Sequence, residues 1–75
     1  MADYMEQRMK ISKKDINVVY NLLLVANEPL TNSRIREYTN LDKEVVKKIL
    51  RLLYHNDKVI KYKGGIRVYW EAKNE

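Results

Sequence analysis

The sequence lacks cysteine entirely and contains one histidine, one proline and two glycines. Without cysteine the chain has no disulfide framework, no thiolate nucleophile and no cysteine-based zinc site. It also lacks any apolar run of about eighteen residues, so we expect no membrane span. Because the N-terminus lacks the apolar segment of a signal peptide, we expect a cytoplasmic protein, or one in the host cytoplasm if the chain is viral.

Groups that carry catalytic chemistry are also scarce. A chain of 75 residues has room for one domain, and a large cleft enzyme does not fit in it. The single histidine, His55, lies at the predicted end of a helix and cannot complete a Ser-His-Asp set. No glycine-rich phosphate loop is present, and the ten acidic residues follow no metal-binding spacing. We therefore expect no enzyme activity, no metal, no cofactor and no small-molecule substrate.

What the sequence does have is an uneven distribution of positive charge. The formal net charge is +5. Residues 1–30 carry four basic and four acidic side chains, whereas residues 31–70 carry ten basic and four acidic ones. The basic excess therefore occupies one contiguous stretch, which points to an anionic partner, with nucleic acid first in line.

Three helices are predicted from a start pattern that occurs three times. Ser12, Thr31 and Asp42 can each cap a helix. An apolar residue precedes each cap and another follows it four residues later, which is the spacing of a hydrophobic staple. The predicted helices run from Ser12 to near Asn27, over about 32–39, and from about Lys43 to Asn56. The residues expected to face inward are Ile16, Val19, Tyr20, Leu23 and Leu24 in the first helix and Val46, Ile49, Leu50 and Leu53 in the third.

A β-hairpin is predicted after the third helix. Residues 59–62 and 66–70 are β-branched and aromatic, which favours strands. Between them, Gly64 and Gly65 are expected to form the centre of a tight turn. Alternation places Ile60, Tyr62, Ile66, Val68 and Trp70 on inward faces and Lys61, Lys63, Arg67 and Tyr69 on the opposite faces.

The order helix, helix, helix, hairpin resembles a winged helix-turn-helix DNA-binding protein. The span TNSRIREYTNLDKEVVKKILRLLYHNDKVIKYKGG (31–65) carries the resemblance: a short helix, a Leu-Asp turn, a basic third helix and a basic hairpin. It is similar to small archaeal and archaeal-virus transcription regulators. The resemblance covers about residues 12–71 and implies an α+β fold of three helices followed by a two-stranded β-hairpin wing.

The remaining residues flank this expected winged helix domain. Residues 1–11 are expected to form an N-terminal arm, a candidate dimerisation segment whose alternative is a frayed terminus. Residues 72–75 are expected to form a short tail.

The resemblance also implies which residues contact DNA. In this class the third helix enters the major groove, the start of the second helix touches phosphate, and the wing touches the backbone or the minor groove. Carried over position by position, the implied DNA-binding residues are Ser33, Arg34, Lys43, Lys47, Lys48, Arg51, Lys61, Lys63 and Arg67.

A physical argument supports the third helix independently of the resemblance. Lys43, Lys47 and Arg51 are spaced four residues apart and form one stripe, with Lys48 beside it. Like charges at this spacing cost a few tenths of a kcal/mol per pair, a cost that a polyanion would offset. The alternative is an ordinary solvated surface, in which Glu44 and Lys48 form a favourable pair.

The sequence therefore predicts a sequence-specific transcription regulator that binds double-stranded DNA. We expect a homodimer, because one module of this size buries little protein surface on DNA. Two alternatives stay open. One is a protein-interaction winged-helix module, and the other is a non-specific DNA-packaging protein.

Overall fold

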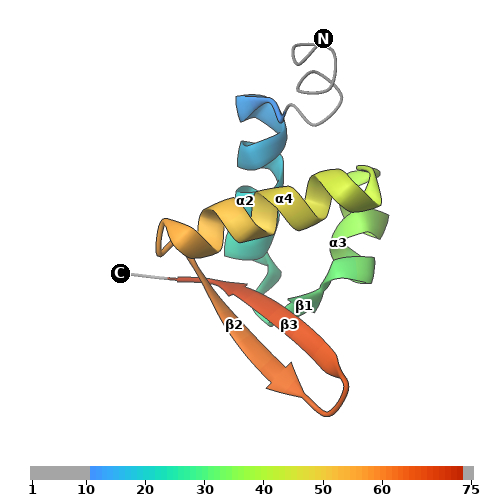
Figure 1. The fold of residues 1–75 in the computed structure, drawn as a ribbon, viewed down its shortest axis with the longest axis vertical. Coiled ribbons are helices and arrows are strands. Elements are labelled where there is room, and N and C mark those ends of the chain that lie inside the picture. Colours follow the sequence, from blue (N-terminus) through green and yellow to red (C-terminus); the bar gives the residue numbers. More distant parts are fainter. Residues whose placement is uncertain (1–10, 74–75) are drawn as a thin grey trace, which may run out of the picture.

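The computed structural model describes residues 11–73 of the chain. The predicted N-terminal arm lies, except for its last residue, outside the described residues, as do residues 74–75. Figure 1 shows three helices above a twisted hairpin. The elements are α2 (Lys13–Ala26), β1 (Leu30–Thr31), α3 (Asn32–Thr39), α4 (Lys43–His55), β2 (Val59–Gly64) and β3 (Arg67–Ala72).

All three helices begin at the predicted caps. The side chain of Ser12 accepts a hydrogen bond from the Asp15 amide at 3.1 Å, and that of Thr31 accepts one from the Arg34 amide at 3.2 Å. Asp42 occupies the N-cap position of α4 without a side-chain hydrogen bond. The predicted helical bounds are confirmed. They could be predicted because caps depend on short-range contacts within one turn.

Asparagine ends two helices in a chain that has few glycines. Asn27 and Asn40 adopt the left-handed conformation, with φ of 67° and 62°. Asparagine tolerates this region better than most residues, so it can replace the glycine that commonly follows a helix. The Asn40 amide donates to the Arg36 carbonyl at 2.7 Å, which closes α3 and starts the turn toward α4.

The sheet has three strands in the order β1-β3-β2, not the two that we predicted. The short strand β1 pairs antiparallel with β3, with Leu30 opposite Trp70. This strand is only two residues long and follows directly after Pro29. It escaped prediction because alternation cannot be detected over so short a segment.

The hairpin turn lies one residue later than we predicted. Gly64 pairs with Arg67, so the loop consists of Gly65 and Ile66. Gly65 has a φ of +66°, which a glycine adopts without strain. Ile66, which we expected to face inward on a strand, is instead fully exposed at the tip (101%).

The structure places Lys61 and Lys63 on the same face of the hairpin as Trp70, whereas the prediction placed them on the opposite face. Directly opposed residues in an antiparallel pair share a face. Because Lys61 is opposite Trp70 and Lys63 is opposite Val68, both lysines lie on the tryptophan face. On the other face, the Tyr62 hydroxyl donates to Glu71 Oε1 at 2.7 Å, and this hydrogen bond raises the pKa of Tyr62.

The core lies where α2, α3 and α4 meet the sheet. Its buried side chains are Val19, Leu23, Leu30, Ile35, Val46, Ile49, Leu50, Leu53, Val59 and Trp70. All four residues predicted to face inward from α4 are among them. Leu24 is a correction: it lies at the edge of the apolar stripe of α2 and stays 42% exposed.

Truncation of Leu50 provides a test of this packing. Leu50→Ala removes a fully buried side chain, so we expect the free energy of unfolding to fall by about 2–5 kcal/mol. Leu52→Ala is the matched control, because Leu52 lies on the same helix and is 45% exposed. Urea denaturation followed by circular dichroism measures both. Equal losses from the two variants would contradict the assignment of the core.

Candidate nucleic-acid interface

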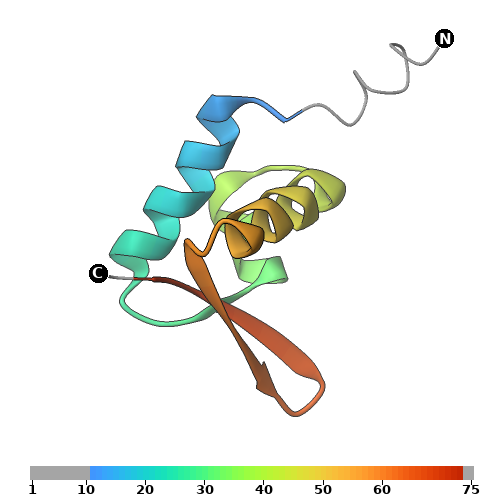
Figure 2. The same cartoon turned by 60° about the vertical axis from the view of Figure 1, so that its left-hand side comes forward.

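A groove of about 910 Å³ separates α4 from the hairpin and the start of α3. Residues from all three regions form its walls. They are Thr31, Asn32, Ser33, Glu44, Lys47, Lys48, Arg51, Tyr54, His55, Lys61, Arg67, Val68 and Trp70. Figure 2 shows the hairpin extending away from the helices, with α4 above it.

The apolar half of α4 determines which side chains face this groove. Val46, Ile49 and Leu50 are fully buried against the rest of the domain. Leu53, one turn after Ile49 and Leu50, is also buried. At 3.6 residues per turn, Lys47 and Arg51 lie between these buried positions and point away from the core. Lys47 and Arg51 are consequently exposed and line the groove.

The structure brings together six of the nine predicted DNA-binding residues. Those that line the groove are Ser33, Lys47, Lys48, Arg51, Lys61 and Arg67. They come from α3, α4 and both long strands, and so from segments distant in sequence. Their convergence could not be deduced from the spacing within any one element.

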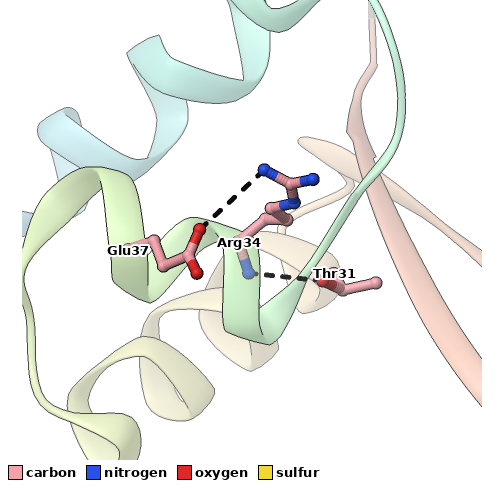
Figure 3. Close-up of polar contacts among 3 residues, drawn as sticks. All are labelled: Thr31, Arg34 and Glu37. Carbon is pink, nitrogen blue, oxygen red and sulfur yellow. Dashed lines mark hydrogen bonds and ion pairs between the residues drawn. The ribbon is translucent and has the colours of Figure 1, made fainter.

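The other three predicted residues, Arg34, Lys43 and Lys63, are exposed but do not line the groove. Figure 3 shows the guanidinium group of Arg34 directed toward Glu37, with Nη1 and Oε1 3.9 Å apart. Its backbone amide faces the Thr31 cap. The proposed DNA contacts of Arg34, Lys43 and Lys63 stay predictions.

The floor of the groove contains aromatic residues that the list of predicted site residues missed. Tyr54 and Trp70 meet edge to face, with ring centroids 6.1 Å apart. Trp70 Nε1 also donates to Asn32 Oδ1 at 2.6 Å. This hydrogen bond joins residues 38 positions apart, so no local pattern could have revealed it.

The same aromatic rings hold Lys61 in place. Its Nζ lies 5.7 Å from the centroid of Tyr54 and 5.7 Å from that of Trp70. A lysine over two aromatic rings gains cation–π attraction that a freely solvated lysine lacks. The ammonium group of Lys61 is therefore oriented toward the groove before any ligand arrives.

The electrostatic character of the groove is strongly positive. Five cationic side chains and one carboxylate, that of Glu44, line it. In the part of the chain that the structure describes, the ion pairs are Arg34–Glu37 and Asp57–Lys73, and neither involves a groove cation. Unpaired cations lining one concavity raise the local concentration of anions.

Within residues 11–73, no group of three or more His, Cys, Asp or Glu side chains could hold a metal ion. Over the same range, no helix combines the length and the hydropathy that crossing a membrane requires.

Comparison with known proteins gives matches among solved structures only. No protein-family model matches the chain, and no curated protein matches it by sequence. MepR, a transcription regulator of the Staphylococcus aureus multidrug efflux pump MepA, superposes with a TM-score of 0.68 at 18% identity, covering 96% of this chain and 53% of that one.

Two further solved structures share this arrangement. A mutant of ZitR from Lactococcus lactis gives a TM-score of 0.66 at 20% identity, over 87% of this chain and 44% of that one. The adhesin competence repressor AdcR from Streptococcus pyogenes gives 0.65 at 17% identity, over 95% and 54%.

These matches show the fold. The domain is a winged helix, in which α3 and α4 form the helix-turn-helix and the β2–β3 hairpin is the wing. The predicted fold class is thereby confirmed. The chain spans about half the length of the solved structures it matches. All three come from bacteria, so the similarity to archaeal and archaeal-virus regulators stays a prediction from sequence.

The hydrogen bond between Trp70 and Asn32 can be tested by substitution. Asn32→Ala leaves the indole N–H without its acceptor in a partly buried site, so we expect a loss of about 1–3 kcal/mol in the free energy of unfolding. Ser33→Ala, at the exposed neighbouring position, is the control and should change stability little. Urea denaturation followed by circular dichroism provides both values. If Asn32→Ala costs as much in a Trp70→Phe background as alone, the bond does not contribute.

Proposed function

We propose that the protein is a transcription regulator that binds double-stranded DNA in a sequence-specific manner. The observation that carries this proposal is the groove in which cations from α4 and the wing converge. Lysine and arginine that neutralise phosphates release condensed counterions, which drives association with DNA. An anionic strand in this groove would meet five cations and one carboxylate.

In the proposed complex α4 lies in the major groove. The major groove, about 12 Å wide, admits one α-helix. Lys47, Lys48 and Arg51 would then face base edges and flanking phosphates, and lysine or arginine contacts to guanine are common in direct recognition. Lys61 and Arg67 of the wing face α4 across the groove of the protein, and they would hold the sugar–phosphate backbone of one DNA strand.

The fold of the matched structures supports this proposal. MepR and AdcR are named a transcription regulator and a repressor. Each superposes on more than nine-tenths of the length of this chain. A regulator of this kind would act in the cytoplasm, where DNA is accessible.

A second candidate function is docking of an acidic protein. The observation that favours it is the pair of aromatic rings on the groove floor, since aromatic residues are enriched at protein interfaces. A DNA-packaging protein would instead use the same cations for phosphate contacts alone. A packaging protein would bind every DNA sequence alike, and a protein-docking module would not need DNA, whereas the proposed regulator prefers particular sequences.

We also propose that two copies associate through the outer face of α2. Val18 and Val25 are 39% and 76% exposed, and half-buried Leu22 lies on the same side of the helix. Residues 11–30 carry two basic and two acidic side chains, so two copies repel each other little along α2. The half-sites on DNA would then be about ten base pairs apart.

DNA binding is tested by fluorescence anisotropy with a random duplex pool and a selected duplex at several salt concentrations. Lys47→Ala or Lys48→Ala should weaken specific binding by about 1–3 kcal/mol where the lysine contacts a base. Lys63→Ala should weaken all duplexes alike and reduce the salt slope by about one. Lys14→Ala, which removes the same charge from the exposed side of α2, is the control and should change neither value.

The outcomes separate the three candidate functions. Salt-dependent binding with a large preference for the selected duplex supports the regulator. Salt-dependent binding without preference indicates packaging. If the protein binds no duplex at low salt, the DNA proposal is wrong and the acidic-protein alternative remains.

The dimer is tested by sedimentation velocity. Val25→Glu places a charge in the proposed interface, so we expect a shift from dimer toward monomer. Asn17→Glu adds the same charge at an exposed position on another side of α2 and should leave the mass unchanged. Removal of residues 1–10 should also give monomer if the arm takes part. A wild-type protein that sediments as a monomer would end the dimer proposal.

A further inference from the structure

The tip of the wing carries an apolar side chain that no part of the described chain covers. Ile66 is the second loop residue of the hairpin, and its exposure of 101% means that it contributes no buried surface. Its close neighbours Lys63 and Arg67 are both exposed cations. Figure 1 shows this loop at the end of the molecule farthest below the helices.

The fold itself does not account for an isoleucine at this position. The two-residue turn requires a positive φ at Gly65, which glycine supplies. Ile66 has no such requirement, and an exposed aliphatic side chain gains nothing from the hydrophobic effect. The side chain of Ile66 is therefore fully available to a ligand.

The proposed mode of DNA binding determines what this tip would meet. If α4 occupies the major groove of DNA, one sugar–phosphate backbone of the duplex runs between α4 and the wing. The groove on the other side of that backbone is the minor groove. The wing lies on that side, so its tip is directed toward the minor groove.

We propose that Ile66 enters the minor groove as an apolar wedge, partly unstacks one base step and bends the duplex; this inference rests on the proposed function. The minor groove is about 6 Å wide, and two strands with their side chains are broader than that, so only the tip can enter. Isoleucine is among the side chains that proteins insert between base steps. Lys63 and Arg67, on either side of the tip, would neutralise the phosphates that border the groove.

This mechanism also defines the DNA that the tip prefers. Isoleucine forms no hydrogen bond with a base edge, so its contribution to specificity depends on how easily the step deforms. Pyrimidine–purine steps such as TA unstack readily, whereas A-tracts are stiff. The wedge therefore selects for a flexible step beneath the tip, at a position that no polar side chain contacts.

The experiment uses the full chain and two duplexes that share the selected site. One duplex has a TA step beneath the wing, and the other has an AA step there. Dyes at the two ends report bending by energy transfer, and 2-aminopurine beside the step reports unstacking. We expect the wild-type protein to bend the TA duplex, to raise 2-aminopurine fluorescence, and to prefer TA over AA by about tenfold.

Two variants isolate the contribution of Ile66. Ile66→Ser should retain the salt slope but lose the bend, the 2-aminopurine signal and the preference for TA. Ile66→Leu restores an aliphatic side chain and should restore all three. Because Ile66 buries no surface, both variants should unfold at the wild-type urea concentration, which circular dichroism checks.

The possible outcomes distinguish failure of the wedge proposal from failure of the proposed DNA-binding function. If the wild-type protein binds no duplex, the proposed function fails and the wedge fails with it. If the wild type binds the site but Ile66→Ser bends, unstacks and selects as the wild type does, the wedge alone is wrong. The same conclusion holds if neither protein bends the duplex.

Discussion

The division of α4 into an apolar half and a cationic half is the constraint on which the rest of the structure depends. Its four inward side chains are at least 95% buried. Burial of each such side chain contributes about 1.5–3 kcal/mol, so rotation of α4 about its axis would cost most of the stability of a small domain. The cations of the opposite half are therefore held toward the groove by the packing of the core.

A second constraint positions the wing relative to α4. Trp70 of β3 is buried in the core, contacts the ring of Tyr54 on α4 and donates to Asn32 at the start of α3. Its strand also pairs with β1, opposite Leu30. A single residue thus joins the sheet to both helices of the helix-turn-helix. These contacts help to fix the separation between the wing cations and those of α4.

The parts of the fold that could be predicted from sequence depend on local interactions. The helix starts at Ser12, Thr31 and Asp42 were found because a cap and its staple lie within one turn. The register of the hairpin was not, since an error of one residue at Gly65 moves the turn and every cross-strand partner. The aromatic floor of the groove escaped prediction because the faces of the two strands were assigned without their pairing, which put Lys61 and Trp70 on opposite faces, whereas Lys61 lies directly opposite Trp70.

The groove also combines a cost in the free protein with a gain in the proposed complex. Neighbouring cations on α4 repel each other by a few tenths of a kcal/mol per pair, far less than the core contributes to holding the helix. A phosphate strand would relieve this repulsion, but phosphates are the same in every duplex. Charge can therefore give affinity without selecting a sequence. Selection has to come from contacts with base edges or from the deformability of the DNA, and Ile66, as an uncharged side chain at the wing tip, can contribute only through the second.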